Sequence, residues 1–298
     1  MPDTLVIVNP KAGRGTAPHL AAAVVALAAA HGIRCQVLTT NAADQARAAA
    51  RDAASRGASA VVAIGGDGTI HHVVAGINAV SATCALLPIA SGQGNDTIRS
   101  LGLPNDWRQA ASLLWNGRPR SIDLLRARWP DGHTDLAVNV LSAGFDAEVA
   151  ATVRAARHVH GSAAYLLAAV RGIWRLRHRH LAIDLDGRSQ SGAALFVVVA
   201  NGGWYGGGMQ IVPGAVVDDG CLDLALAGPL TRLDALRTLP RLYSGGHAGH
   251  PLFMLRRGTA VRIGGEPAPV QIDGEAAPPT PLTVTLEPHA LQVLRLNP

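Results

Sequence analysis

The stretch at residues 63–69, Ala-Ile-Gly-Gly-Asp-Gly-Thr, constrains the fold more than any other part of the chain. It continues an apolar, β-branched run that is typical of a buried strand. A segment whose apolar residues have helical spacing comes next. A glycine turn at this place lets backbone N–H groups approach an anion, and the helix N-terminus adds partial positive charge. We interpret the stretch as the phosphate site of a nucleotide, with an ordinary tight turn as the alternative.

Asp67 lies in the middle of this turn. A carboxylate that touched a phosphate directly would bring two negative charges together. Asp67 fits the site if Mg²⁺ or a hydrogen-bonded water lies between the two groups. The residue therefore predicts a magnesium ion beside the nucleotide.

Two further expected strands end in glycine-rich loops. Residues 5–8 are followed by Asn-Pro-Lys-Ala-Gly-Arg-Gly at 9–15, and residues 85–89 are followed by a loop that contains Gly94, Asn95 and Asp96. Strands and helical patterns alternate up to about residue 124, which indicates a parallel sheet with its ligand at the carboxyl ends of the strands. We therefore expect residues 1–124 to form an α/β nucleotide-binding domain.

The pattern changes to mainly antiparallel β-structure after residue 125. A hairpin is expected around Pro130-Asp131-Gly132, between residues 122–128 and 136–140. Later strands are expected at residues 181–185, 195–200, 222–227, 260–263, 270–273, 282–286 and 291–296. We therefore expect residues 125–298 to form a second, β-rich domain with a helical insertion near residues 147–179.

The helical insertion is basic and amphipathic. Arginines and histidines are frequent between residues 150 and 180, and Leu166, Val170, Ile173 and Trp174 follow a helical period. Such a segment can lie on an anionic bilayer, as a peripheral membrane contact. It can equally be a pair of helices that pack on the second domain with the arginines in water, and this second interpretation is the commoner case.

Composition limits the class of protein. The 298 residues are 48% hydrophobic and 16% charged, which is typical of a globular chain. The net charge of +5 fits acidic partners such as a nucleotide or an anionic membrane. The three cysteines form no CxxC motif, which argues against a disulfide framework or a zinc site. With no spanning apolar run or signal peptide in the sequence, we expect a cytoplasmic protein.

Eight motifs, in order, resemble the diacylglycerol kinase catalytic-domain family, in its bacterial soluble lipid kinase branch. The resemblance covers almost the whole chain. It rests on Asn9-Pro10-x-x-Gly13, Gly65-Gly66-Asp67-Gly68-Thr69, Leu87-Pro88 with Gly94-Asn95-Asp96, Ile122-Asp123, Asn139 with Gly144-Phe145-Asp146, Gly206-Gly207-Gly208-Met209 with Pro213-Gly214-Ala215, Asp218-Asp219-Gly220-x-Leu222-Asp223, and Ile272-Asp273-Gly274-Glu275.

The resemblance implies an N-terminal, NAD-kinase-like α/β domain, a C-terminal antiparallel β-sandwich and an active site between the two. It also implies transfer of a phosphoryl group from Mg-ATP to a lipid hydroxyl. Asp273 matches the general base that is proposed for the family. Asp67, Asp96, Asp123 and Glu275 match carboxylates that the family gathers around this base through Mg²⁺ and water.

Other site residues are also carried over by resemblance. Asp219 would hold a second, structural Mg²⁺ with backbone carbonyls near Val216 and Cys221, and a plain β-turn is an equal alternative there. The loop at residues 202–209 would face the lipid. The residues expected to contact ATP or to line its cleft are Asn9, Lys11, Gly13, Gly65, Gly66, Gly68, Thr69, Gly94 and Asn95.

Five positions depart from the family pattern. Gln93 stands where the family usually has a hydroxyl residue, and His71 and His72 stand where it commonly has Asn and Glu. Thr97 replaces a usual large apolar residue, and Ala12 replaces a frequent serine. None of the five is a proposed base or metal ligand. These departures concern the details of the nucleotide loops and the preference for a nucleotide.

The sequence therefore predicts an ATP- and Mg²⁺-dependent lipid kinase, with diacylglycerol as the first acceptor to consider. Phosphatidylglycerol or a sphingoid base are alternative acceptors. An NAD kinase is a second enzyme interpretation, because it shares the Gly-Gly-Asp-Gly motif, and a nonenzymatic lipid- or nucleotide-binding protein is a third. The expected partner is a lipid at a membrane surface and not nucleic acid, and a homodimer is one assembly that we consider.

Overall fold

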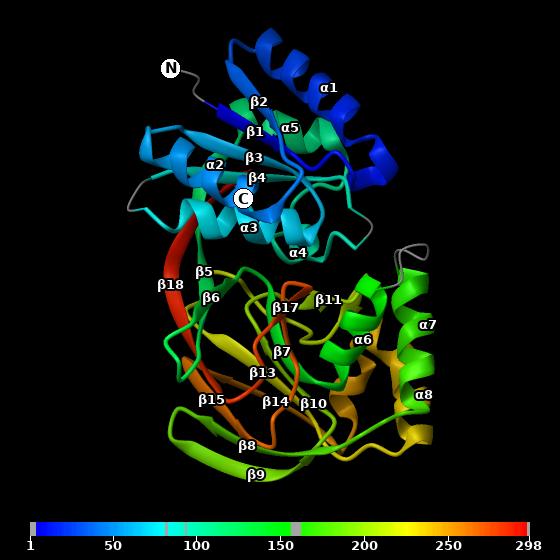
Figure 1. Cartoon of the computed structure of the whole chain (residues 1–298). Coiled ribbons are helices and arrows are strands. Elements are labelled where there is room, and N and C mark those ends of the chain that lie inside the picture. Colours follow the sequence, from blue (N-terminus) through cyan, green and yellow to red (C-terminus); the bar gives the residue numbers. More distant parts are fainter. Residues whose placement is uncertain (1–3, 81–82, 93, 156–161, 297–298) are drawn as a thin grey trace. The chain divides into compact units, whose positions relative to one another are not determined.

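The computed structural model describes residues 4–80, 83–92, 94–155 and 162–296. The chain divides into two compact units. Unit 1 consists of residues 1–122 and 289–298, and unit 2 of residues 123–288. The structure therefore has the expected combination of an α/β domain with a parallel sheet and an antiparallel β-sandwich (Figure 1).

Unit 1 is built on a parallel sheet with the strand order β2-β1-β3-β4. The central strands β1 and β3 are largely apolar and buried along their whole length, as expected of strands covered on both faces. Helices lie on both sides of the sheet in Figure 1, with α1 and α5 on one side and α2 and α3 on the other. The elements are β1 (Thr4–Val8), α1 (Ala17–Ala30), β2 (Cys35–Thr39), α2 (Ala43–Ser55), β3 (Ala60–Gly65), α3 (Asp67–Ile77), β4 (Ala85–Ala90), α4 (Asp96–Ser100) and α5 (Trp107–Asn116).

The ends of these helices follow local sequence signals. Asp106 precedes α5, and its carboxylate accepts hydrogen bonds from the backbone N–H groups of Arg108 and Gln109, both at 3.0 Å. Gly32 follows α1 at φ +78°, and its N–H bonds to the carbonyl of Ala29. A capping aspartate and a glycine with positive φ therefore mark these two helix ends, as local sequence rules predict.

Unit 2 contains a six-stranded antiparallel sheet with the order β14-β13-β10-β7-β16-β17. A second sheet contains β5, β6, β8, β9, β15 and the first part of β18. The strands are β5 (Arg118–Arg128), β6 (Thr134–Ala137), β7 (Val140–Gly144), β8 (Arg179–Leu185), β9 (Arg188–Ala194), β10 (Phe196–Ala200), β13 (Leu222–Ala227), β14 (Phe253–Gly258), β15 (Ala260–Gly265), β16 (Val270–Ile272), β17 (Glu275–Ala277) and β18 (Leu282–Arg295). A short ribbon pairs β11 (Trp204–Tyr205) with β12 (Met209–Gln210).

The six-stranded sheet of unit 2 is buried on both faces. Alternate side chains of its strands, such as Leu141 and Val199, belong to the apolar core between the two sheets. The residues between them, such as Val140 and Val198, belong to a second core on the opposite face. Helices α6 (Phe145–Ala155), α7 (Ser162–Ile173) and α8 (Arg232–Leu242) contribute to this second core and lie side by side in Figure 1.

The last strand differs from the sequence-based expectation. Residues 282–286 and 291–296 were expected as two strands of one C-terminal domain, whereas β18 runs without a break from Leu282 to Arg295. Its second part pairs in parallel with β4, with Gln292 opposite Ala85 and Val293 opposite Leu86. Residues 289–298 therefore belong to unit 1 and not to the domain expected at 125–298.

Candidate functional site

Three glycine loops of unit 1 meet at the carboxyl ends of β1, β3 and β4. A Cβ atom added to Gly92 would lie 2.7 Å from the Cα of Gly66, and one added to Gly13 would lie 2.8 Å from the hydroxyl of Ser91. Glycine fits both positions, because the backbone of Gly66 lies too close to Gly92 for a side chain and Gly13 has a positive φ of +59°. The parallel sheet brings together loops that are far apart in the sequence, as the motif spacing predicted.

The Gly-Gly-Asp-Gly-Thr stretch forms the expected strand–turn–helix. β3 ends at Gly65, Gly66 is extended at φ −94° and ψ −174°, and α3 begins at Asp67. Thr69 closes the turn, since its N–H bonds to the carbonyl of Gly66 at 2.9 Å. A Cβ atom on Gly65 would lie 2.3 Å from the Thr69 hydroxyl. The turn therefore brings backbone N–H groups and the N-terminus of α3, which includes Gly68, to one point.

The first loop is tied to this turn by side chains. The amide of Asn9 donates to the Thr69 hydroxyl at 3.3 Å. The carbonyl oxygen of the same Asn9 side chain accepts from the backbone N–H of Lys11 at 3.0 Å. Asn9, Lys11 and Thr69, which the sequence assigned to the nucleotide, are thus in one hydrogen-bonded group. Gln93 lies outside the described residues.

Asp67 and Asp96 approach each other around Gly94. A Cβ atom on Gly94 would lie 3.2 Å from Oδ2 of Asp67 and 3.5 Å from Oδ2 of Asp96. Asp67 also accepts from the backbone N–H of Thr97 at 3.0 Å, and Asp96 forms an ion pair with Arg99 at 2.8 Å. Two carboxylates close together favour a bound cation.

Asn95 adds a polar atom to this group. The residue is left-handed, at φ +53°, and a Cβ atom on Gly92 would lie 3.1 Å from its side-chain carbonyl oxygen. This oxygen is buried without a hydrogen-bond partner among the described residues. A buried acceptor of this kind is costly unless a ligand satisfies it, so Asn95 supports a binding role for the loop.

Asp273 lies in the tight turn between β16 and β17 in unit 2. Asp273 and Gly274 have φ values of +48° and +89°, and Ile272 pairs with Glu275, which are features of a two-residue hairpin turn of type I′. An Asp-Gly pair is favoured in this turn because both residues tolerate positive φ. The backbone thus explains why an aspartate stands here, and the half-buried Glu275 follows Gly274.

The Asp273 carboxylate is held by the backbone of residues 138–140. Its Oδ1 accepts from the N–H groups of Asn139 at 3.0 Å and Val140 at 2.9 Å, and its Oδ2 accepts from that of Val138 at 2.8 Å. The residue is only 5% exposed. Three N–H donors fix the orientation of the carboxylate, which is a property that a catalytic group needs.

Asp123 is connected to the same region. It is fully buried in β5, and its Oδ2 accepts from the N–H of Gly220 at 2.8 Å. Its backbone carbonyl accepts from the side-chain amide of Asn201 at 2.7 Å, and the same amide also donates to the carbonyl of Val138 at 2.9 Å. Asn201 therefore joins Asp123 to the segment that holds Asp273.

Sequence reasoning did not single out Asn201. Its side-chain carbonyl oxygen, like that of Asn139, is buried without a hydrogen-bond partner among the described residues. The available signal was weak, since an Asn-Gly pair directly after an apolar strand also fits an ordinary turn. The structure distinguishes Asn201 from an ordinary turn residue, because it is fully buried. Its side chain bonds to Asp123 and to Val138, which are 15 residues apart in the sequence.

The expected structural-metal residues form a loop beside Asp123. Asp219 accepts from the N–H of Cys221 at 3.1 Å and forms an ion pair with Arg257. Val216 is exposed. The carbonyl of its neighbour Val217 accepts a hydrogen bond from the backbone N–H of Asp123 at 2.7 Å. Within the described residues, no three His, Cys, Asp or Glu side chains form a group that could hold a metal ion. The structural Mg²⁺ at Asp219 thus stays a prediction.

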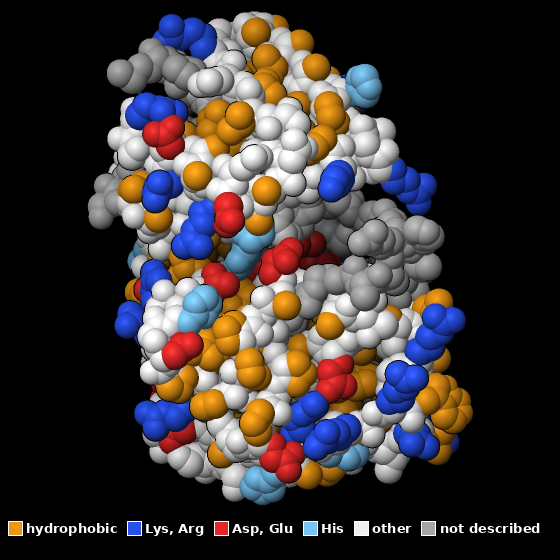
Figure 2. Space-filling view, viewed as in Figure 1, with side chains coloured by type: hydrophobic (Ala, Val, Ile, Leu, Met, Phe, Trp, Pro, Cys, Tyr) orange, Lys and Arg blue, Asp and Glu red, His pale blue; other side chains and the backbone are white. Residues whose placement is uncertain are grey.

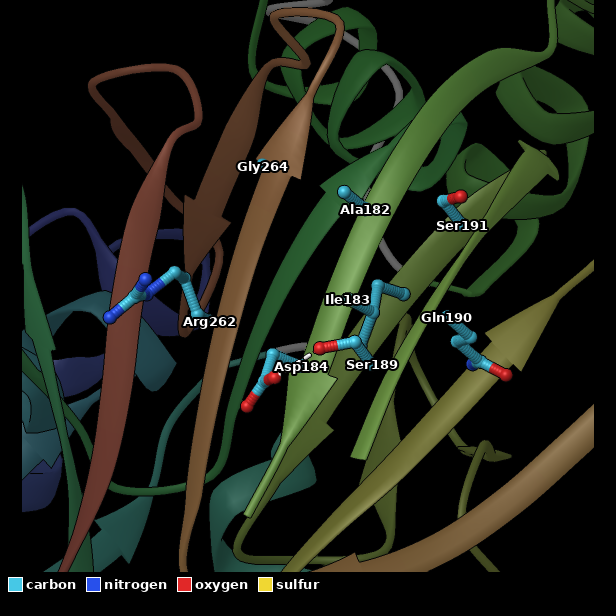
Figure 3. Close-up of a pocket in the computed structure, with 8 residues that line it drawn as sticks. All are labelled: Ala182, Ile183, Asp184, Ser189, Gln190, Ser191, Arg262 and Gly264. Atoms are coloured by element: carbon cyan, nitrogen blue, oxygen red, sulfur yellow. Dashed lines mark hydrogen bonds between the residues drawn. The ribbon is translucent and has the colours of Figure 1, made fainter. Parts of the chain in front are cut away.

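A hollow on the second sheet of unit 2 is separate from all these residues. It has a volume of about 530 Å³ and is lined by β8, β9 and β15 (Figure 3). Figure 3 shows Asp184 and Ser189, which line the hollow, joined by a hydrogen bond, with Arg262 on the neighbouring strand. None of the expected nucleotide, base or metal residues lines this hollow. Among the described helices, none is long and apolar enough to span a bilayer.

Comparison with known proteins gives the family. Residues 3–127 match the family described as "Diacylglycerol kinase catalytic domain", and residues 139–295 match "YegS C-terminal NAD kinase beta sandwich-like domain". A diacylglycerol kinase of Mycobacterium tuberculosis (strain H37Rv) is 30% identical over 291 residues, which are 97% of this chain and 94% of that protein. The chain belongs to the diacylglycerol kinase family. It is therefore an enzyme of the lipid kinase class.

Two other similar proteins agree with this family. A probable lipid kinase YegS-like of Pseudomonas putida is 33% identical over 247 residues, covering 81% of this chain and 79% of that protein. The solved structure of a putative diacylglycerol kinase from Bacillus anthracis str. Sterne matches with a TM-score of 0.81 at 24% identity, covering 99% of this chain and 97% of that one. This last likeness shows the fold.

Proposed function

We propose that this kinase transfers the γ-phosphoryl group of ATP to the hydroxyl of a membrane lipid, with diacylglycerol as the first acceptor to test. The observation that carries the proposal is the meeting of three glycine loops beside Asp67 and Asp96, at the carboxyl ends of parallel strands. Relatives named diacylglycerol kinase and lipid kinase match over 97% and 81% of the chain.

Unit 1 supplies the features that binding of a nucleoside triphosphate needs. The N–H groups of the turn at residues 65–69 and the N-terminus of α3 favour bound phosphate. The side chain of Lys11, in the neighbouring loop, carries a positive charge. Phosphoryl transfer depends mainly on positioning and charge neutralisation, and these groups serve both purposes.

Unit 2 supplies the group that takes up the proton. As the lipid hydroxyl oxygen attacks the γ-phosphorus, the bond to the leaving ADP breaks and the hydroxyl proton passes to Asp273. A carboxylate in this role contributes roughly 10²–10⁴-fold to the rate. The three N–H donors from residues 138–140 keep Asp273 in one orientation. Glu275 and Asp123 are the other carboxylates of this unit in the proposed site.

The residues of each unit fit a magnesium ion. Carboxylate and carboxamide oxygens are ligands that Mg²⁺ prefers, and the side-chain oxygens of Asn95, Asn139 and Asn201 are buried acceptors without partners among the described residues. We propose that Asp67, with Asp96, Asp123 and Glu275, holds the ion directly or through water. Bound Mg²⁺ would neutralise charge on the phosphates.

Other acceptors remain within the proposal. Phosphatidylglycerol and sphingoid bases also present a hydroxyl group on a lipid, and the acceptor would meet the loop at residues 202–209. NAD kinase is the second candidate function, because it shares the Gly-Gly-Asp-Gly motif. The near full-length match to proteins named as diacylglycerol and lipid kinases favours a lipid.

The proposal is tested by transfer of labelled γ-phosphate from Mg-ATP to a panel of lipids in mixed micelles, with NAD as an additional acceptor. The variant Asp273→Asn should lose at least about 10²-fold in kcat, because an amide cannot act as the base. It also weakens the hydrogen bonds to residues 138–140, because an amide nitrogen cannot accept them.

Asp186 provides a matched control for that second effect. It lies in another Asp-Gly turn at φ +49°, and its carboxylate accepts from the backbone N–H groups of Thr259 and Ala260, both at 2.9 Å. Asp186→Asn should therefore lose similar backbone contacts and keep the kinase rate within about twofold. Equal losses of rate in Asp186→Asn and Asp273→Asn would contradict the base assignment. Labelled NAD without any labelled lipid would contradict the lipid acceptor.

We also propose that α7 contacts an anionic membrane surface. Ala168, Ala169 and Ile173 are buried in the core of unit 2, so one face of the helix packs as a cover. Leu166 is nevertheless exposed by 41% and Leu167 by 43%, and Trp174 just beyond the helix by 66%. The exposed cations Arg171 and Arg175 lie among them.

This mixture of exposed apolar and cationic side chains supports membrane contact. Figure 2 shows blue and orange side chains next to one another over the part of unit 2 that carries α7. Arg157, His158 and His160, which the sequence also placed in this basic segment, lie outside the described residues.

The test is sedimentation with vesicles of phosphatidylcholine alone or with added phosphatidylglycerol. The double variant Arg171→Glu, Arg175→Glu should bind the anionic vesicles at least about tenfold more weakly, because each basic residue contributes about 1 kcal/mol near such a surface. Arg188→Glu with Arg256→Glu, on other elements of the same unit, is the matched control. Binding that is insensitive to both pairs and to salt would contradict the proposal.

A further inference from the structure

Three polar side chains are buried together where α6 packs on the six-stranded sheet. Ser142 on β7 is fully buried, Gln271 on β16 is 3% exposed and Asp146 on α6 is 3% exposed. Ser142 and Gln271 are direct partners in the β7–β16 pairing. None of the three has a role in the proposed transfer step.

The surroundings of these side chains are apolar. The core on this face of the sheet contains Val140, Phe145 and Val198, and along β16 the neighbours Val270 and Ile272 point into the other core. A buried polar group in such a place costs free energy unless a hydrogen bond compensates it. Hydrogen bonds must therefore offset the free-energy cost of burying these three side chains.

Gln271 makes hydrogen bonds at both ends of its amide. Its Nε2 donates to the hydroxyl of Ser142 at 2.8 Å, and its Oε1 accepts from the backbone N–H of Gly274 at 2.7 Å. Gly274 is the second residue of the type I′ turn, directly after Asp273. One side chain therefore connects the interior of the sheet to the turn that carries the proposed base.

Asp146 lies near Ser142 without a hydrogen bond to this connection. Both of its carboxyl oxygens are buried, and burial raises the pKa of Asp146 to about 7. The Ser142 hydroxyl and the Ala147 N–H partly oppose the rise in this pKa, although neither makes a hydrogen bond of good geometry to the carboxyl oxygens. Because Ser142 accepts from Gln271, its own hydrogen is available to Asp146.

The turn is held from two directions. The N–H groups of residues 138–140 hold the Asp273 side chain, and Gln271 holds the N–H of Gly274. Positive φ at Asp273 costs a side-chain-bearing residue free energy, so the surrounding contacts must maintain it. Loss of the Gln271 side chain would remove this contact with the second turn residue.

We propose that Gln271 is a positioning residue for Asp273, supported from behind by Ser142. The proposal rests on the proposed kinase function, in which Asp273 takes the proton of the acceptor hydroxyl. Gln271 touches neither substrate. It acts by keeping the Asp273-Gly274 turn in the conformation that orients the carboxylate.

The test compares Gln271→Met with Gln292→Met. Methionine has nearly the volume of glutamine and makes neither hydrogen bond, so the sheet should keep its packing. Gln292 is a matched control in unit 1, because its Nε2 donates to the hydroxyl of Ser121 at 2.7 Å without a connection to Asp273. We expect Gln271→Met to lower kcat about tenfold with an unchanged KM for ATP, and Gln292→Met to stay within about twofold of wild type.

The same substitution in the Asp273→Asn background separates positioning from general loss of structure. If Gln271 acts through Asp273, the double variant should be no slower than Asp273→Asn alone. A further tenfold loss in the double variant, or a wild-type kcat in Gln271→Met, would overturn the proposal. Ser142→Ala is the second variant if Gln271→Met does not fold, and it should give a smaller loss of kcat with the same dependence on Asp273.

Hydrogen exchange at the Gly274 amide provides a measurement that does not need kinase activity. Gln271→Met should speed this exchange at least about tenfold relative to wild type, while amides in β10 and β13 keep their protection. Unchanged exchange at Gly274 would overturn the positioning role even if the enzyme is active. Faster exchange in a protein that phosphorylates no lipid would support the role of Gln271 in the turn and count against the proposed function alone.

Discussion

At the scale of single residues, the dipeptide Asp-Gly has different environments in two turns of the chain. Asp186-Gly187 and Asp273-Gly274 both form turns with positive φ at each residue, and each aspartate caps neighbouring N–H groups. Asp273, however, is buried beside Asn139, whose side-chain oxygen has no partner among the described residues. Asp186 is exposed. Local sequence predicts the turn in both cases, and burial distinguishes the candidate site.

Asp146 makes a residue-scale prediction about pH. Burial raises the pKa of Asp146 to about 7, from about 3.8 in an unfolded chain, and the nearby Glu148, which pairs with Arg179 at 2.6 Å, adds a smaller increase. Between these pH values the folded state binds more protons than the unfolded state. The stabilisation is therefore complete below about pH 4 and is lost as the pH rises through 7.

The expected measurement is urea unfolding of wild type and Asp146→Asn from pH 4 to pH 8. The free energy of unfolding of wild type should fall relative to that of Asp146→Asn by about 1–4 kcal/mol over this range, because asparagine cannot ionise. Asp184→Asn, a control on the surface of unit 2, keeps Asp146, so its free energy of unfolding should fall with pH in parallel with that of wild type. Parallel curves for wild type and Asp146→Asn would show that Asp146 is not the group that titrates.

At the scale of elements, α3 connects packing to the candidate site. Its N-terminus carries Asp67 and Thr69, and its far end packs against α2 through Gly76. A Cβ atom on Gly76 would lie 2.3 Å from the carbonyl oxygen of Arg47 and 2.8 Å from the Cβ of Ala50. The glycine is therefore explained by a close approach between helices, which no periodicity of the sequence indicated.

Gly76→Ala sets two effects of opposite sign against each other. Alanine is better than glycine in a helix interior by about 1 kcal/mol, but the clash with the backbone of α2 costs about 1–3 kcal/mol or more. We expect a net decrease in the free energy of unfolding, measured in urea. Gly264→Ala, where a Cβ atom would meet no atom within 4 Å, should be nearly neutral. A more stable Gly76→Ala would mean that α2 moves away at little cost.

At the scale of the whole molecule, β18 determines how the chain is divided. Leu291, Val293 and Leu294 on its second part are buried in unit 1, and Arg295 donates to the carbonyl of Leu101 at 3.0 and 2.6 Å. Unit 1 therefore needs residues from both ends of the chain. The sequence placed these apolar residues in a strand correctly but assigned the strand to the other domain.

Truncation of the chain after Pro288 should destabilise unit 1 alone. The truncated chain loses three buried apolar side chains, which together contribute roughly 5 kcal/mol. Hydrogen exchange should show loss of protection in β1, β3 and β4, while β10 and β13 in unit 2 stay protected. A chain that ends at Arg295, which lacks the 59% exposed Leu296, is the control and should behave as wild type. Equal loss of protection in both units would mean that they unfold as one.

The sequence alone determined what depends on neighbours along the chain. The strand–glycine–helix units, the Asp106 cap, the hairpin around Asp131-Gly132 and the change from parallel to antiparallel structure follow from local propensity and spacing, and the motif order indicated the family. Only the tertiary structure decided the partners of β18, the buried bridge at Asn201 and the connection from Ser142 through Gln271 to Gly274. These features join segments from distant parts of the sequence. Their free energy comes from burial and hydrogen-bond geometry, which no local pattern contains.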